Sequence, residues 1–419
     1  MRETNFKQTE VGLIPNTWIL LSLGQLFDFK NGLNKGKEFF GYGTPIVNFT
    51  DVFNNPKMYE STIKGLVSVT LNEIKSCNAH KGDVFFTRTS ETPEEVGMSS
   101  VLLDELDSAV FSGFVLRARP KTDMLDSEYS GICMRSNCVR QQIIKSSTYT
   151  TRALTSGAKL SEVLLPLPSL SEQRKIAKAL TDVDNLISSL TKLIVKKQNI
   201  KSATMQQLLT GKKRLDGFTE PWGETEIGKL GRSYSGLTGK SAKDFGHGTS
   251  KYITFLNVLN NPKIDISIFE KVDVSEGESQ NKVKKGDLLF NTSSETPEEV
   301  GICSAMLEDI DELYLNSFCF GFRPNEEVDS LFMSYWFRSS EGRNLMITLA
   351  QGSTRYNLSK DNMMKSVIQI PSREEQNAIS NILSDMDIEI SILEQKRDKY
   401  EAIKKGMMQE LLTGRIRLV

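Results

Sequence analysis

Apolar residues follow two alternating patterns along the chain. In residues 1–168 and again in residues 216–371, short apolar runs are separated by glycine, asparagine and proline, which is typical of β-strands joined by turns. Five runs are predicted strands: 84–86, 110–117, 163–165, 288–290 and 367–370. Two further segments are predicted helices: 131–144 and 333–338. Each region is therefore expected to fold as a strand-rich α+β domain.

Residues 169–215 and 372–419 are instead predicted to form long helices. Their apolar residues recur at alternating spacings of four and three, and this 3.5-residue period is that of a coiled-coil seam. Each helix is expected to run to a glycine, Gly211 or Gly414, and about 36 residues at 1.5 Å per residue give a rod of roughly 54 Å. The predicted seam consists of Ile176, Leu180, Val183, Ile187, Leu190, Ile379, Leu383, Met386, Ile390 and Leu393.

Polar residues interrupt both seams near their ends, at Lys197, Lys201, Arg397 and Lys404. Two interpretations are open: the coiled coil is defective or frayed there, or its ends separate to meet another subunit. The helices also differ in charge, since residues 172–214 hold ten basic and three acidic side chains and residues 374–419 hold seven and nine. Opposite net charges favour pairing, although salt screens exposed charges. Alternatively, the basic helix faces phosphate or an acidic partner.

The second half of the chain repeats the first. SETPEEVG stands at 90–97 and at 294–301, and LLTGKKRL at 208–215 corresponds to LLTGRIRL at 411–418. An antiparallel pairing of the two helices would bury both seams and place two similar domains about an approximate two-fold axis. DNA is itself roughly two-fold symmetric, and paired reading modules use that symmetry. The repeat therefore favours a DNA-recognition protein with two recognition domains, whose separation is set by the long helices.

Composition excludes several other classes of protein. A length of 419 residues predicts two or three domains. Five cysteines without a CxxC pair and only two histidines argue against zinc sites, disulfide frameworks and most histidine centres, and favour a reducing cytoplasm. No long apolar segment predicts a membrane span or a secretory signal. With a net charge of −1, any DNA binding must depend on local basic faces.

These features resemble the specificity subunit of a type I restriction–modification enzyme over essentially the whole chain. The resemblance rests on a globular region followed by PLPSLSEQRKIAKAL (166–180) and a helix ending in LLTGKKRL. A second copy supplies IPSREEQNAISNIL (370–383) and LLTGRIRL. The resemblance implies two target-recognition domains, each reading one half of a split target in double-stranded DNA. It also implies that the helices set the unread spacer and dock two modification subunits.

The same resemblance implies that this chain is not catalytic and holds no cofactor or metal. The modification subunits would bind S-adenosylmethionine and methylate adenine, while restriction subunits would use ATP and Mg for translocation and cleavage. The two globular regions are unusually alike for this family, whose recognition regions diverge greatly. We therefore expect the two half-sites to share bases when each is read from its own end.

The residues in and just ahead of SETPEEVG are the first candidates for reading bases. Thr87-Arg88-Thr89 in the first copy stands against Asn291-Thr292-Ser293 in the second. Arginine can pair with guanine, asparagine with adenine, and serine or threonine with several base edges. An ordinary polar loop is the alternative. The predicted DNA-binding set here is Arg88, Thr89, Ser90, Glu91, Asn291, Thr292, Ser293, Ser294 and Glu295.

Basic residues near these segments are candidates for phosphate contacts, which position a protein without reading sequence. Lys35 and Lys37 lie in a glycine-rich stretch, 31–43, and Lys240 and Lys243 lie in a similar one, 235–248. Solvated loops are an equal alternative for all four. Two arginines occupy the same repeat position, and they are expected to contact the DNA backbone or to tie each domain to its helix: Arg152 and Arg355, the latter followed by the candidate Tyr356.

Three motifs imitate catalytic sites. The carboxylates of SETPEEVG could hold a hydrolytic cation, but no lysine follows, and a turn with a helix start is favoured. GLTGKS at 236–241 has too few residues between its glycines for a phosphate loop and is expected to be a flexible basic loop near DNA. Asn55-Pro56 and Asn261-Pro262 precede lysine rather than the Pro-aromatic pair of an adenine methyltransferase, and turns are expected there.

Two other classes of function remain open. One is a structural adaptor whose heads bind proteins, for which DNA binding would stay indifferent to sequence. The other is a nuclease or methylase, for which the isolated chain would cleave or methylate DNA.

Overall fold

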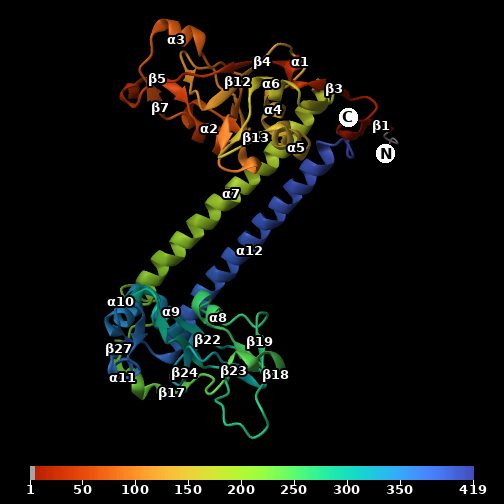
Figure 1. Cartoon of the computed structure of the whole chain (residues 1–419). Helices are drawn as coiled ribbons and strands as arrows, with labels where there is room; N and C mark the ends of the chain where they lie inside the picture. Colours follow the sequence, from red (N-terminus) through yellow and green to blue (C-terminus); the bar gives the residue numbers. More distant parts are fainter. Residues whose placement is uncertain (1–4) are drawn as a thin grey trace. The chain divides into compact units, whose positions relative to one another are not determined.

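The computed structural model describes residues 5–419, and the chain divides into two compact units. Among the described residues, unit 1 comprises residues 5–190 together with 396–419, and unit 2 comprises residues 191–395. Both boundaries fall inside long helices, α7 (Leu170–Leu208) and α12 (Arg373–Leu411), which are labelled in Figure 1. Each unit therefore contains one strand-rich domain and a part of each long helix.

A five-stranded sheet in the order β4-β12-β8-β10-β6 forms the centre of unit 1. Neighbouring strands are antiparallel except β10 and β6. All of β8 is buried because a hydrophobic cluster covers each face: Val84 and Phe86 join one cluster and Phe85 joins the other. The strands are β4 (Phe27–Asn31), β6 (Lys57–Met58), β8 (Val84–Thr87), β10 (Ser99–Leu102) and β12 (Val115–Pro120).

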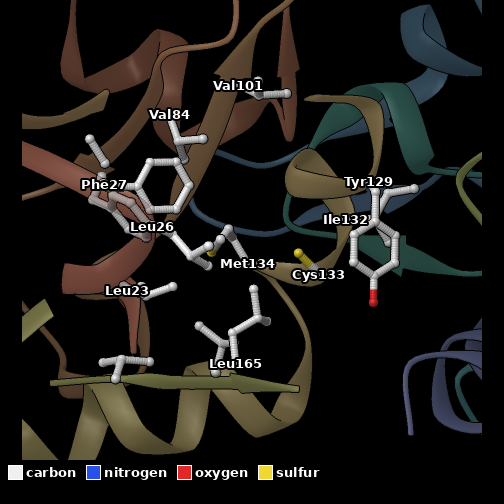
Figure 2. Packing of buried hydrophobic residues seen from close by; sticks show 14 of the residues in the cluster. Leu23, Leu26, Phe27, Val84, Val101, Tyr129, Ile132, Cys133, Met134 and Leu165 are labelled. Carbon is white, nitrogen blue, oxygen red and sulfur yellow. The ribbon is translucent and has the colours of Figure 1, made fainter. Parts of the chain in front are cut away.

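The larger cluster of unit 1 lies between this sheet and the helices α4 (Ser127–Cys133) and α5 (Asn137–Ser146). Figure 2 shows the side chains of Phe27, Val84, Met134 and Leu165 gathered in it. Further strands frame the domain: β1 (Phe6–Thr9), β2 (Gly12–Pro15), β3 (Ile19–Ser22), β5 (Phe40–Val47), β7 (Gly65–Val67), β9 (Thr89–Ser90), β11 (Val110–Phe111), β13 (Thr148–Tyr149), β14 (Ala153–Leu154) and β15 (Leu164–Leu167). The short helices are α1 (Leu23–Leu26), α2 (Phe49–Asn54), α3 (Leu71–Ser76) and α6 (Gly157–Ser161).

Unit 2 repeats this plan around a four-stranded sheet in the order β17-β24-β20-β22. Strand β20 of this sheet also separates two hydrophobic clusters, with Leu288 and Phe290 on one face and Leu289 on the other. The main sheet contains β17 (Gly231–Ser235), β20 (Leu288–Asn291), β22 (Cys303–Ala305) and β24 (Cys319–Pro324). The other strands are β16 (Gly223–Glu226), β18 (Phe245–Ile253), β19 (Glu270–Val272), β21 (Ser293–Ser294), β23 (Leu313–Leu315), β25 (Ala350–Gln351), β26 (Tyr356–Leu358) and β27 (Val367–Ile370), and the helices are α8 (Phe255–Asn260), α9 (Ser330–Arg338), α10 (Ser340–Leu349) and α11 (Lys360–Lys365).

Within each unit the two long helices pack antiparallel. In unit 1, Leu180 near the start of α7 shares a cluster with Leu411 at the end of α12. In unit 2, Leu383 near the start of α12 shares a cluster with Leu208 at the end of α7. The segment that closes each half of the sequence therefore packs in the unit of the other half.

The predicted seam residues differ in burial along both helices. The two seam residues nearest the start of each helix are buried, and so is one residue farther along each helix: Ile176, Leu180, Leu190, Ile379, Leu383 and Ile390. The other four residues of the predicted seam are half-buried: Val183, Ile187, Met386 and Leu393. Beyond the helix ends, Gly211 and Gly414 have φ of 67° and 69°, the left-handed conformation that glycine adopts most easily after a helix.

Of the four polar residues that interrupt the seams, the three lysines form ion pairs between the helices, and Arg397 pairs with Asp398 of its own helix. In unit 2, Lys197 Nζ lies 2.7 Å from a carboxylate oxygen of Glu389, and Lys201 pairs with Asp387. In unit 1, Lys404 Nζ lies 2.5 Å from Asp184. The interruptions are therefore neither frayed nor separated, because each lysine meets a carboxylate of the opposite helix.

Two predicted elements were wrong in detail. The expected strand at 110–117 is broken into β11 and β12 by a turn at 113–114, because Gly113 and Phe114 leave the ladder, whereas Ser112 still forms an isolated bridge with Leu33. The expected helix at 131–144 is two helices, since the Ser136 hydroxyl accepts a hydrogen bond from the Val139 N–H and starts α5 anew. The strands at 84–86, 288–290 and 367–370 and the helix at 333–338 are confirmed.

Candidate nucleic-acid interface

The first candidate segment, residues 88–91, is held between a turn and a strand. The Arg88 N–H donates to the Phe114 carbonyl over 3.0 Å, and the Arg88 carbonyl accepts from the Thr155 N–H over 3.0 Å. Beyond it, Ser90 in β9 stands opposite Ala153 in β14. These contacts fix the backbone while leaving the Arg88 and Thr89 side chains half-exposed and Glu91 exposed.

Unit 2 holds its candidate segment in the same way. The Thr292 N–H donates to the Phe318 carbonyl over 2.9 Å, and the Thr292 carbonyl accepts from the Leu358 N–H over 2.9 Å. Ser294 in β21 stands opposite Tyr356 in β26. Thr292 is half-exposed and Glu295 is exposed, as are their counterparts in unit 1. The two units thus present different side chains on one backbone design.

The serine that opens SETPEEVG has a structural partner in both copies. Ser90 Oγ donates to Glu95 Oε2 over 2.9 Å, and Ser294 Oγ donates to Glu299 Oε2 over 2.8 Å. Both hydroxyls are largely buried. The acidic residues after each serine form a short 3₁₀ turn, Pro93–Glu95 in unit 1 and Pro297–Glu299 in unit 2. The predicted turn is therefore confirmed, but the helix start expected after it is only this short turn. We call each of these segments the acidic turn. The predicted base contacts of Ser90 and Ser294 compete with these bonds.

Asn291 is a structural residue, and its prediction as a base-reading side chain was wrong. Its side chain is 0% exposed. Its Nδ2 donates to the Glu299 carbonyl over 2.7 Å, and its Oδ1 accepts from the Ile302 N–H over 2.6 Å. Thr87 has the same place in unit 1, where its hydroxyl accepts from the Met98 N–H over 2.9 Å. Both side chains anchor the acidic turn and point away from any ligand in solvent.

The two arginines at the same repeat position lie beside the candidate segments. Arg152 is exposed in the turn between β13 and β14, directly before the residue that pairs with Ser90. Arg355 is exposed directly before Tyr356, and its Nε donates to Ser293 Oγ over 3.1 Å. The bond of Arg355 is to its own domain rather than to a long helix. Ser293 and Tyr356 are less available, because Ser293 is buried and Tyr356 packs partly against the core.

A hollow of about 380 Å³ in unit 1 brings several predicted residues together. Four of them line it beside three aromatic rings and a further carboxylate: Thr89, Ser90, Glu91 and Arg152, with Phe49, Phe53, Phe114 and Glu95. The rings of Phe49 and Phe53 stack with centroids 5.5 Å apart. The hollow therefore combines aromatic walls with one cationic and two anionic groups, a set that can stack on a base and hydrogen-bond to its edge.

The lysines of the glycine-rich stretches are largely engaged within the protein. Lys240 Nζ lies 2.6 Å from Glu278, and its side chain is only 7% exposed. Lys35 Nζ lies 2.8 Å from Glu73 and 4.5 Å from the centre of the Phe39 ring. Its hydrogen bond lowers the pKa of Glu73 to about 2. A phosphate would have to share Lys35 or Lys240 with these carboxylates, which weakens both predictions.

The remaining two lysines and two of the motifs that resemble catalytic sites lie in turns, in a loop or at helix ends. Lys37 begins the 3₁₀ turn Lys37–Phe39, and Lys243 lies in the turn Ala242–Asp244, where its carbonyl contacts the His247 ring. GLTGKS is a loop between β17 and that turn. Asn55 and Asn261 end α2 and α8, as the expected turns require.

Sequence reasoning missed two half-buried arginines, one in each domain, that hold the domains together. Arg135 donates to the Ser99 carbonyl over 2.6 Å and to the Val52 carbonyl over 2.7 Å. Arg338 makes the same contacts in unit 2, with the carbonyls of Cys303 and Val258. Burial lowers the pKa of each guanidinium to about 10. The repeated Arg-Ser pair, at 135–136 and 338–339, was the signal in the sequence that could have revealed them.

A second missed pair supports the acidic turns directly. Arg140 donates to the carbonyls of Gly97 and Glu94 over 2.8 and 2.7 Å. Arg343 donates to the carbonyls of Val300 and Glu298 over 2.5 and 2.9 Å. Each arginine thus fixes the turn behind a candidate segment. Among residues 5–419, His, Cys, Asp and Glu side chains form no group that could hold a metal ion, and no helix is long and apolar enough to span a membrane.

Comparison with known proteins agrees with this duplicated architecture. The family model for the type I restriction modification DNA specificity domain matches residues 15–201 and again residues 219–402. A putative type I restriction enzyme specificity subunit of Methanocaldococcus jannaschii is 24% identical, covering 100% of this chain and 98% of its own length. The chain therefore belongs to the family of type I restriction–modification DNA specificity proteins.

Solved structures show the same fold over nearly the whole chain. The type I specificity subunit from M. genitalium matches with a TM-score of 0.56 at 15% identity, covering 98% of this chain and 97% of that one. A chain described with the assembly and conformational transition of a type I system matches with a TM-score of 0.59 at 14% identity, covering 96% and 99%. Proteins of this family recognise DNA, and the catalytic activities of their complexes lie in other subunits.

Proposed function

We propose that each globular domain reads one half of a bipartite DNA target and that the long helices set the unread spacer. One observation carries the proposal: the same backbone scaffold presents Arg88 and Thr89 in unit 1 and Thr292 in unit 2. A rigid scaffold with exchangeable polar side chains suits recognition of related but different base sequences. The shared scaffold also supports the expectation that the two half-sites have bases in common.

Arg152 and Arg355 complete each reading surface as phosphate contacts. Both are exposed and stand beside the segment that would enter a groove. Contacts to phosphate fix the register of a protein on the duplex, and base contacts then select the sequence. Since the net charge of the chain is −1, such local cations are needed for association with DNA.

The partners of this chain are DNA and the other subunits of a type I system. We propose that the long helices dock two modification subunits, one for each domain, because the chain contains its docking elements twice. S-adenosylmethionine would be bound by those subunits, and ATP and Mg by the restriction subunits. This chain would bind none of them.

The test is to exchange the reading side chains between the units. The chain is expressed with its modification subunit, and methylated sites are mapped by methylation-sensitive sequencing. The wild-type complex is expected to give a split motif. The double variant Arg88→Thr, Thr89→Ser should change the first half-site towards the second and leave the second intact. Lys145→Ala, an exposed change on α5, is the matched control.

One outcome would overturn the proposal, and a second would overturn only the expectation of shared bases. A methylation motif that survives deletion of this chain would show that another protein reads the target. Unrelated half-sites would refute the expectation of shared bases while leaving the two-domain reader intact.

A further inference from the structure

A phenylalanine stands in solvent at the same place in each domain. Phe114 is 65% exposed and Phe318 is 55% exposed. Phe114 lies in the turn between β11 and β12, and Phe318 lies in the corresponding turn between β23 and β24. Single exposed apolar residues are common on proteins and need no explanation. Here the exposure is repeated in both domains, although the residues before the ring differ, Ser-Gly in one and Asn-Ser in the other.

The backbone of each phenylalanine is fixed although its ring is free. The Phe114 N–H donates to Ser112 Oγ over 3.3 Å, and the Phe318 N–H donates to Asn316 Oδ1 over 2.8 Å. The carbonyls accept from Arg88 and Thr292, over 3.0 and 2.9 Å. Each ring is thus tied through one peptide group to the candidate reading segment. A backbone held in this way loses little further freedom on binding, which favours affinity.

Both rings have cationic neighbours. Phe114 lines the hollow of unit 1 together with Arg152 and Thr89. The Arg355 guanidinium lies 5.7 Å from the centre of the Phe318 ring, within the range of a cation–π contact. An apolar ring beside exposed arginine suits a duplex, which offers phosphates at its edge and base methyls and stacked base faces within its grooves.

We propose that Phe114 and Phe318 are base contacts of the two half-sites, each ring packing against bases of the half read by its own domain. This inference rests on the proposed function and adds an apolar element to the polar reading segments. Because the backbone carbonyl of each phenylalanine accepts a hydrogen bond from the reading segment, the two backbone segments would approach the DNA as one rigid surface. Each ring would contribute to discrimination between sequences as well as to affinity.

The experiment uses the complete complex of this chain with its modification subunits. The variants Phe114→Ala and Phe318→Ala are compared with Leu13→Ala in β2 and Val367→Ala in β27, which also remove exposed apolar side chains. Binding is measured to the mapped target duplex and to a scrambled duplex. Thermal unfolding and size-exclusion chromatography follow folding and assembly of every variant.

We expect each phenylalanine variant to lose about 5- to 100-fold in affinity for the target, the range for removing a base contact, with little change on scrambled DNA. Methylation maps should show relaxed selection in one half-site only, a different half for each variant. Unchanged affinities and maps would overturn the inference, and so would a loss of assembly with the modification subunits, which would assign the rings to a protein interface. Failure of the proposed function would appear differently, as a wild-type complex without a split motif.

Discussion

Arg417 Nε and Nη2 donate to the two carboxylate oxygens of Glu172 over 2.5 and 2.7 Å, across 245 positions of the sequence. Glu172 is 1% exposed and also accepts from the Trp18 indole over 3.1 Å. In unit 2 the equivalent bidentate pair joins Arg214 and Glu375, with both distances 2.7 Å. Each pair joins the closing segment after one long helix to the beginning of the other.

Removal of this arginine should therefore destabilise unit 1. Arg417→Ala leaves a buried carboxylate without its cation, which typically costs about 3–5 kcal/mol. The urea midpoint of unit 1, followed by Trp18 fluorescence, is expected to fall. Lys178→Ala, which breaks the exposed pair with Asp182, should change stability by less than about 1 kcal/mol. Equal effects of the two variants would contradict the assignment.

The seam of the long helices should respond to truncation according to burial. Leu383 is 0% exposed, whereas Ile392 on the same helix is 58% exposed. Leu383→Ala is expected to lower the free energy of unfolding by about 2–5 kcal/mol through lost burial and a residual cavity. Ile392→Ala should stay within about 0.5 kcal/mol of the wild type. Thermal denaturation of both variants checks the contrast, and a large loss for Ile392→Ala would indicate that this face is covered.

Asn291 should affect stability but not the recognised sequence. Asn291→Ala leaves the Glu299 carbonyl and the Ile302 N–H buried without partners, at about 1–3 kcal/mol for each unsatisfied group. Asn291→Thr, the residue of the corresponding position in unit 1, should recover part of that loss. Methylation mapping of Asn291→Thr is expected to return the wild-type motif. A changed base preference at one position would restore Asn291 as a reading residue.

Phosphate contacts by Arg152 and Arg355 should appear in the salt dependence of DNA binding. Removing one phosphate contact lowers the slope of log K against log salt by about 1 and weakens binding to all sequences alike. Titrations of the complex at several salt concentrations, with target and scrambled duplexes, measure both quantities for Arg152→Ala and Arg355→Ala. A slope equal to that of the wild type would show that the arginine has a structural role only.

Glu73 should titrate far below other glutamates. The Lys35 ammonium, with the Thr70 N–H, lowers its pKa from an ordinary 4.5 to about 2. Because the folded pKa lies below the unfolded one, the stabilisation is present above about pH 4.5 and is lost as the pH falls towards 2. NMR titration of labelled glutamate carboxyls tests this, and Lys35→Ala should move the pKa back upwards. A wild-type value near 4.5 would show that the pair does not form in solution.

The sequence predicted the elements that depend on local periodicity and missed those that depend on packing. The long helices followed from a seam sustained over many turns. The apolar run at 110–117 concealed a turn because its residues are buried on both sides of the break. Asn291 could not be distinguished from an exposed asparagine, since its partners lie 8 and 11 residues farther on in a turn whose shape is tertiary.

Among the candidate contacts, the repeat located the reading segments but not their supports. Ser90 and Ser294 belong to an identical motif, which suggested function, yet their hydroxyls serve the turn itself. Arg135 and Arg140 bind backbone carbonyls, which side-chain patterns do not record, and only the repeated Arg-Ser pair marked the position of Arg135. The exposed rings of Phe114 and Phe318 are ordinary members of apolar runs in the sequence and became conspicuous only through their exposure in both domains.

The segment that ends each half of the sequence packs in the unit of the other half, and this affects the order in which the units fold during synthesis. Unit 2 is one continuous stretch, whereas unit 1 needs residues 396–419 to complete its core. At about 5–20 residues per second, the ribosome takes roughly 10–40 s to pass from the end of the first stretch of unit 1 to its second stretch. During that interval unit 2 can finish folding while Ile176 and Leu180 still lack their partners. The domain that is synthesised first is therefore the last to complete its core. Until then, the face of α7 that packs against residues 396–419 is exposed, and a chaperone or a neighbouring subunit can bind it during synthesis.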